Sequence, residues 1–85
     1  MNKIVSSIME VDLSAIRCPV IAIYNHPDDY PDKVVARIFD MDIPADTIML
    51  ADTADELAQD IHRNTGMVFF LRGVDDVPCL LGAWV

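Results

Sequence analysis

The densest group of side chains able to do chemistry is a histidine and three aspartates within seven residues: His26, Asp28, Asp29 and Asp32. Imidazole and carboxylate groups are common ligands of divalent cations, and a histidine beside a carboxylate can act as a general base. This spacing makes a metal site, and with it a small metal-dependent hydrolase, one candidate for the segment. The segment lacks the glycine and the bidentate glutamate of an EF-hand loop, and two prolines restrict how it wraps a cation. The interpretation that we favour is a structural loop in which His26 hydrogen-bonds the loop backbone.

A second candidate catalytic pair is Asp40 and Asp42. Residues 38–42, Ile-Phe-Asp-Met-Asp, resemble the first motif of haloacid-dehalogenase-type phosphatases, in which an apolar strand ends in Asp-x-Asp. The resemblance implies a nucleophile at Asp40 and a general acid at Asp42, on a parallel, doubly wound sheet. The sequence departs from that motif directly afterwards, because Ile43-Pro44 stand where the family has glycine followed by threonine or valine. That fold also needs far more than 85 residues, so we expect a chance match.

Other signatures of catalysis and of cofactor binding do not occur in the sequence. It has no phosphate-binding loop and no Gly-x-Gly-x-x-Gly run, and its serines lack the glycine context of a nucleophile elbow. We therefore expect no cofactor. Cys18 and Cys79 are the only cysteines and form no Cys-x-x-Cys motif, which favours free thiols in a reducing cytoplasm.

The charge of the chain is strongly negative and is concentrated in its middle. There are 14 acidic and 6 basic residues, for a formal net charge of −8. Residues 28–60 contain ten of the acidic and two of the basic residues, which alone gives −8. A field of this sign repels nucleic-acid phosphates and anionic lipid, so we expect no direct nucleic-acid binding and no membrane association. No apolar run approaches the length of a membrane span, and the first residues do not form a secretory signal.

The same acidic segment is a candidate surface for a protein partner. We assign six residues to it: Asp28, Asp29, Asp32, Asp55, Glu56 and Asp60. Because carboxylates can replace phosphates in a basic cleft, one alternative is an acidic nucleic-acid mimic, an inhibitor of the anti-CRISPR type. That alternative requires the acidic side chains to line one face.

Apolar periodicity predicts the elements that must position these groups, in a single domain over residues 1–85. Strands are expected at 18–24, 33–39, 47–51, 67–72 and 79–85. The run from Thr53 to Glu56 fits a capping box, and an apolar stripe with Gly66 as the stop predicts an amphipathic helix over 53–65. Residues 1–17 are ambiguous, because their apolar positions fit a loose helix, while Ile4 to Met9 could instead form an edge strand. The order predicts an α+β fold, with one antiparallel sheet of about five strands and the helix packed on one face.

The second face of this sheet also needs a cover. Three of the expected strands are apolar on both sides, and one helix covers only one face. Either the N-terminal segment or a second copy of the chain must cover the other. We expect a homodimer held by sheet-face or edge contacts near Phe69 and Trp84. The function class that we favour is a non-enzymatic protein–protein interaction module.

One resemblance extends over most of the chain. Residues 18–33, continuing through 35–40 and 50–53, resemble short bacterial proteins of unknown activity that are often carried by mobile genetic elements. The resemblance implies a bacterial cytoplasmic setting and assigns no functional residue.

Overall fold

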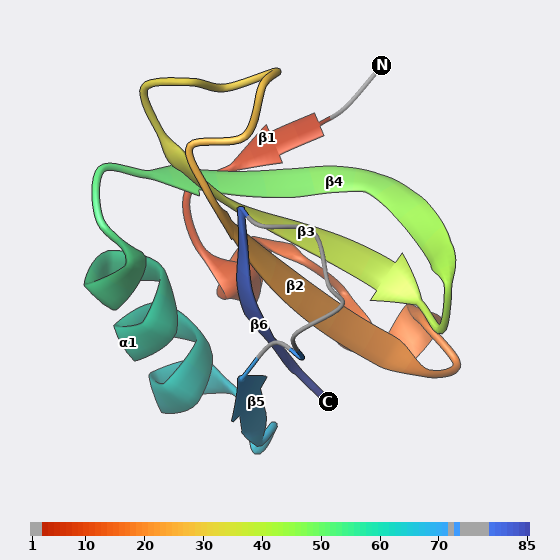
Figure 1. Ribbon diagram of the computed structural model, residues 1–85. Coiled ribbons are helices and arrows are strands. Elements are labelled where there is room, and N and C mark those ends of the chain that lie inside the picture. The colour runs from red at the N-terminus through yellow and green to blue at the C-terminus, as the bar shows by residue number, and fades with distance from the viewer. Residues whose placement is uncertain (1–2, 72, 74–78) are drawn as a thin grey trace.

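The computed structural model describes residues 3–71, 73 and 79–85, which form a six-stranded sheet with one α-helix packed against it (Figure 1). Two single-turn 3-10 helices, η1 and η2, lie near the N-terminus. The bounds are β1 Lys3–Val5, η1 Ile8–Glu10, η2 Leu13–Ala15, β2 Pro19–Asn25, β3 Val34–Asp40, β4 Ile43–Ala51, α1 Ala54–Asn64, β5 Phe69–Leu71 and β6 Leu80–Trp84. The spatial order is β1-β4-β3-β2-β6-β5. The expected α+β class is confirmed.

The N-terminal segment makes the sheet larger and more mixed than expected. β1 pairs parallel with β4, with Lys3 opposite Thr47, whereas the other pairs of neighbouring strands are antiparallel. The described residues 3–17 are not one helix: the expected edge strand forms only as far as Val5, and two 3-10 turns follow it. β4 also begins four residues earlier than expected, at Ile43, since a two-residue turn places Ile43 directly opposite Asp40.

The helix begins as the sequence indicates and ends differently. Thr53 Oγ1 accepts a hydrogen bond from the Glu56 amide at 3.3 Å. The Glu56 carboxylate accepts from the amide of Asp52 at 3.1 Å, one residue before the N-cap, so the capping box is offset. At the other end the expectation of a Gly66 stop is wrong. Thr65 is the C-cap, and its amide and hydroxyl both donate to the Ile61 carbonyl. This carbonyl at the helix end is therefore hydrogen-bonded without a contribution from Gly66.

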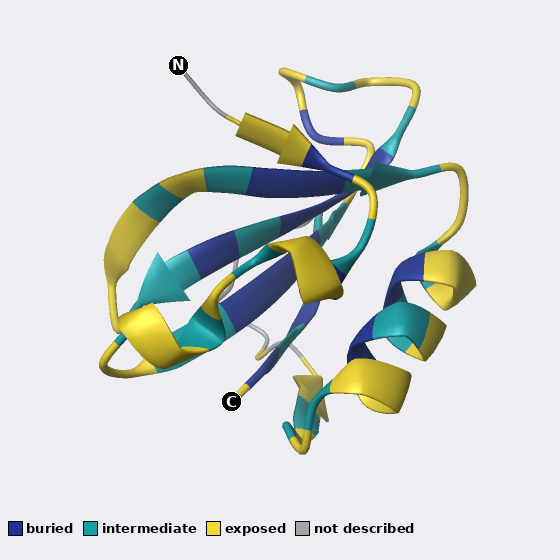
Figure 2. Cartoon of the chain, turned by 180° about the vertical axis from the view of Figure 1, so that it is seen from behind, coloured by how far each residue is buried: buried dark blue, intermediate teal, exposed yellow. Residues whose placement is uncertain are grey.

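The core lies between α1, the N-terminal turns and one face of the sheet. Alternate residues of β3, Val34, Ala36 and Ile38, point into it, as the period of two predicts. Figure 2 is viewed from the side on which the two 3-10 turns cross the sheet, the same side that α1 covers. The N-terminal segment therefore helps α1 to cover this face of the sheet and does not cover the opposite face.

The opposite face of the sheet carries the remaining alternate residues of β3, among them Val35 and Arg37. Val35 is fully buried there, and Ile48 and Ala22 lie in register with Arg37 between them. No described helix packs on this face. In the described residues, no helix has the length and apolar character needed to cross a membrane.

Candidate functional site

The loop between β2 and β3 places His26 in a structural role. His26 has φ 50°, in the left-handed region, and its amide donates to the Lys33 carbonyl at 3.1 Å. Its ring Nδ1 lies 2.8 Å from the Pro31 carbonyl oxygen. Because a carbonyl can only accept, Nδ1 carries the proton in this arrangement. The imidazole thus ties the two ends of the loop together, which is the structural alternative drawn from the sequence.

The carboxylates of this loop are turned to different partners. Asp29 forms an ion pair with Arg37, whose guanidinium also lies over the Tyr24 ring at 5.8 Å. Asp28 and Asp32 are exposed. Among the residues that the structure describes, no three His, Cys, Asp or Glu side chains come together as a metal site would require. The geometry therefore gives no support to a cation site at these residues.

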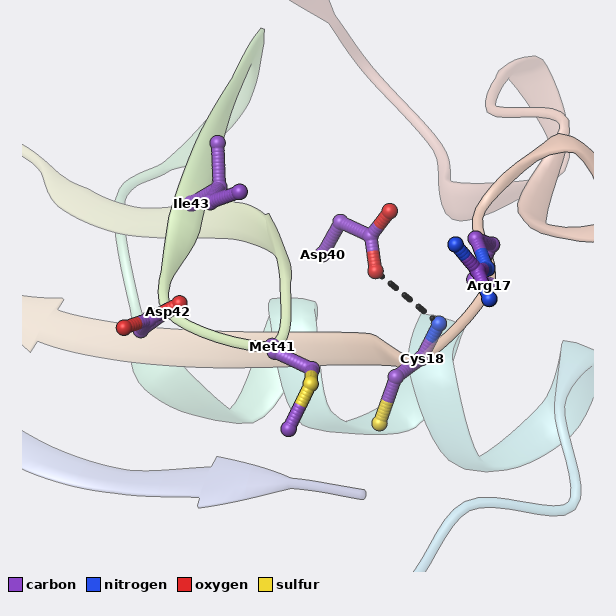
Figure 3. A pocket seen from close by; sticks show the side chains of 6 residues that line it. All are labelled: Arg17, Cys18, Asp40, Met41, Asp42 and Ile43. Atoms are coloured by element: carbon purple, nitrogen blue, oxygen red, sulfur yellow. Dashed lines mark hydrogen bonds between the residues drawn. The ribbon is translucent and has the colours of Figure 1, made fainter.

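The Asp40 and Asp42 pair lies at the β3–β4 turn, on a hollow of about 450 Å³ (Figure 3). Asp40 Oδ1 accepts a hydrogen bond from the Cys18 amide at 3.0 Å, and the Met41 amide donates to the Cys18 carbonyl at 2.8 Å. These two bonds fasten the turn to the start of β2. In Figure 3, Asp42 lies across the turn from Asp40, beside Ile43, and Arg17 stands on the opposite wall.

This arrangement is a hairpin and not the strand–loop–helix of the phosphatase motif. β3 and β4 are antiparallel, so the parallel sheet implied by the motif resemblance is wrong for this chain. Asp40 has a positioning role toward backbone, and the two carboxylates do not face a common point. Among the described residues that line the hollow, Asp40 and Asp42 are not placed as a nucleophile and a general acid would be.

Two of the three predicted acidic residues on α1 accept hydrogen bonds from backbone amides. Asp60 accepts from the Ser7 hydroxyl at 2.8 Å and from the Ile8 amide at 2.6 Å, which joins the helix to η1. Glu56 holds the helix start, as described above. Asp55 is exposed in the first turn, where its charge is favourable to the helix dipole. Of these three predicted partner-binding residues, only Asp55 has no hydrogen bond or ion pair to a side chain or loop within the described ranges.

Asp52, which directly follows β4, is held by an ion pair with Lys33. Lys33 Nζ lies 2.5 Å from Asp52 Oδ1. The hydrogen bond and the opposite charge raise the pKa of Lys33 and lower the pKa of Asp52. Near the N-terminus, the hydroxyl and amide of Ser6 donate to Glu10 and lower the pKa of that carboxyl.

The acidic residues of the middle segment fall at two opposite ends of the sheet. Asp28, Asp29 and Asp32 follow β2, and Asp52 follows β4 at the same end, whereas Asp40 and Asp42 lie at the far end of β3. The seven residues of β3 separate these groups by roughly 20 Å, at a strand rise of about 3.3 Å per residue. The carboxylates therefore do not form a single continuous row.

The edge strand β5 is the largest gathering of exposed apolar side chains in the described residues. Of the eight large hydrophobic residues exposed there, four lie on β5 or beside it, at Val68 (59% exposed), Phe70 (56%), Leu71 (82%) and Val85 (55%). Val68 and Val85 exchange both backbone hydrogen bonds. By the alternation of an antiparallel ladder, the N–H and C=O groups of Phe69 and Leu71 then point away from β6, toward the open edge.

The two aromatic residues predicted at a dimer interface have different positions. Trp84 is 1% exposed and belongs to the core. Phe69 is half-buried, with its ring 4.7 Å from the Trp84 ring, and it lies over Gly82 on the neighbouring strand. Phe69 is therefore at the edge itself, while Trp84 supports the edge from within.

A separate apolar cavity of about 220 Å³ lies between α1 and strands β2, β5 and β6. No pattern along the chain predicts this cavity, because residues far apart in the sequence line it and because one β-bulge shapes it. The pairing of β2 with β6 shifts register between Ile23 and Tyr24, and this turns Leu81 toward the helix side. The lining residues are Ile23, Ala54, Asp55, Ala58, His62, Phe69, Leu81 and Trp84.

Comparison of the chain with protein-family models, with curated proteins and with solved structures finds no match. Function must therefore be argued from the geometry.

Proposed function

We propose that this protein is a protein–protein interaction module that acts as a homodimer joined through the open edge of β5. The observation that carries the proposal is the composition of that edge. Its outward backbone groups pair with no other strand among the residues that the structure describes, and its exposed side chains are apolar at Val68, Phe70 and Leu71. Natural sheets protect such an edge with charges, prolines or bulges, and Val68 to Leu71 contain none of these.

The charge distribution supports a second copy as the partner. Two chains of net charge −8 repel each other, so they can meet only where the charge is low. In the strand order β6 lies between β2 and β5, so at least one strand separates β5 from the strands β2, β3 and β4 that these acidic groups follow. Two antiparallel β5 strands related by a twofold axis would pair identical groups and extend the sheet across both copies.

The other functions drawn from the sequence have less support. A nucleic-acid mimic needs a continuous acidic row, whereas the carboxylates lie at two ends and several are held by partners within the chain. A metal-dependent hydrolase at His26, Asp28 and Asp29 needs converging ligands, whereas the imidazole is bonded to Pro31 and Asp29 to Arg37.

Solution scattering under reducing conditions tests the proposal. We expect a particle of twice the 9.5 kDa chain mass at low micromolar concentration. Leu71→Lys places a charge on the edge at a side chain that is 82% exposed, so it leaves the monomer fold intact and yields monomers. Met9→Lys is the matched control, because Met9 is 75% exposed on η1, and this variant should remain dimeric. A wild-type monomer at this concentration, or an unchanged mass for Leu71→Lys, contradicts the proposal.

A further inference from the structure

The cavity between α1 and the sheet owes its space to small residues on the helix. Ala54 and Ala58 stand about one turn apart on α1 and line the cavity together with Phe69 of β5 and Leu81 of β6. Because the side chain of alanine ends at Cβ, this wall leaves about 220 Å³ unfilled. An apolar cavity of about 150 Å³ accommodates benzene. The space beside α1 therefore has room for a ring that carries a short arm.

Two polar side chains lie along the same wall. Asp55 and His62 also line the cavity, and both are exposed, so they belong to its rim. Their separation of seven residues is about two helical turns, which places them on one face of α1 and about 10 Å apart along its axis. The remaining lining residues are aliphatic or aromatic. A ligand that fits this cavity is therefore apolar along most of its length and polar where it reaches the rim.

The charge at the rim selects the polar group of that ligand. With histidine neutral, Asp55 is the only charged residue among the described residues that line the cavity. Its carboxylate has no hydrogen bond or ion pair to a side chain or loop in the described part of the chain. The whole chain has a net charge of −8, and a field of this sign attracts cations and repels anions. An ammonium group matches this rim, whereas the carboxylate of an anionic ligand would be repelled.

We propose that this cavity binds an arylalkyl amine, with its aromatic ring between Ala58 and Phe69 and its ammonium group beside the Asp55 carboxylate. The ring gains apolar contacts with Phe69 and Leu81, which supply most of the binding free energy. The ammonium group meets Asp55 at the exposed rim, where an ion pair adds a modest preference for a cation. A neutral ligand of the same shape therefore binds more weakly than the amine.

Phenethylamine and phenethyl alcohol are the probes for this site, because they differ only in the group at the end of the same arm. Calorimetry at neutral pH and low salt measures both affinities. We expect the amine to bind about fivefold more tightly, which is the upper end of what one exposed ion pair contributes. Added salt should reduce this preference and leave the affinity for the alcohol unchanged. Absence of binding by either probe, or equal affinities at low salt, overturns the proposal.

Two charge variants locate the ammonium group. Asp55→Asn removes the carboxylate at the rim and should bring the two affinities together. Asp42→Asn is the matched control, because it changes the net charge equally at an exposed residue of the β3–β4 turn, and it should keep the preference for the amine. A preference that persists in Asp55→Asn, or that is lost equally in both variants, contradicts the assignment of Asp55.

Two helix variants locate the ring. Ala58→Leu fills the cavity and should abolish binding of both probes, whereas Gln59→Leu, exposed at the next helix position, should bind like the wild type. Binding that persists in folded Ala58→Leu overturns the proposal. If Ala58→Leu does not fold, the comparison of Asp55→Asn with Asp42→Asn decides alone. A failure here would leave the β5 dimer untouched, since its assay uses no ligand.

Discussion

Replacing Gly82 with alanine should displace β5 from its close contact with β6. A Cβ at this position would lie 2.4 Å from Cζ and 2.7 Å from Cε1 of Phe69, and 2.5 Å from the backbone oxygen of Phe70. The Phe69 ring can rotate away, but the carbonyl belongs to the neighbouring strand. Carbon and oxygen atoms need about 3.3 Å, so β5 must move by nearly 1 Å. That movement also opens the contact between Phe69 and Trp84.

The cost follows from these contacts. Overpacking of an ordered site costs about 1–3 kcal/mol, and partial loss of the Phe69 packing places Gly82→Ala near the upper end of that range. For a domain of 85 residues, 2–3 kcal/mol corresponds to a fall in the melting temperature of roughly 10–15 °C. Since Trp84 is the only tryptophan and contacts Phe69, its fluorescence reports both the global transition and the local change.

Urea denaturation followed by Trp84 fluorescence measures this effect, with Gly66→Ala as the control. Nothing lies within 4 Å of a Cβ added at Gly66, so that variant should match the wild type or be slightly more stable. If Gly82→Ala unfolds at the same urea concentration as the wild type, the close packing of β5 on β6 is refuted. The same variant should also weaken the proposed dimer, because it displaces the strand that forms the interface.

Three other variants test the loops and the helix. Met41 has φ 57°, in the left-handed region, so Met41→Gly should be neutral or stabilise the protein by up to about 1 kcal/mol in urea denaturation. The control is Ile43→Gly, because Ile43 is equally exposed at 67% but lies in a strand, and this variant should be destabilised by a similar amount. Asp60→Ala removes the acceptor of two hydrogen bonds from the N-terminal turn and should cost about 1–3 kcal/mol, whereas Asp55→Ala should cost less than about 0.5 kcal/mol; equal effects would contradict the capping role. The pKa of Asp52 is lower in the folded state than in the unfolded state. Its contribution to stability is therefore present when the pH is above the pKa of the unfolded chain, and it is lost as the pH falls through the pKa of the folded state. Asp52→Asn should therefore unfold with a weaker acid dependence than the wild type, and an identical acid profile would refute this contribution.

Local patterns predicted the elements well where the period was unbroken. β2, β3 and the start of α1 lie within one residue of their expected positions, because alternation and the Thr53 cap are properties of neighbouring residues. The early start of β4 was missed because Ile43-Pro44 has the composition of a turn. Pro44 sits in the strand opposite Phe39 where the pairing is irregular, so its missing N–H is tolerated there.

The candidate sites were predicted less well, because the type of a residue does not determine which group its side chain contacts in the folded chain. The sequence placed four ligand-type side chains within His26–Asp32, but the left-handed turn at His26 directs its ring to a carbonyl. The Asp-x-Asp motif proved to be part of a hairpin, which no count of residues could distinguish from the end of a parallel strand. The cavity beside Trp84 depends on a bulge and on residues from four elements, so no local pattern contains it.

The sequence by itself determined the class of fold, the position of the helix and the concentration of negative charge in residues 28–60, because each depends on periodicity or composition. Tertiary structure decided which of those charges are free. It also decided that the N-terminal segment shares a face with α1, and that β5 ends the sheet with apolar side chains exposed. The physical reason is that pairing between strands is set by contacts over long chain separations, which the pattern along the chain does not encode. The edge proposed to bind a second copy arises from that pairing.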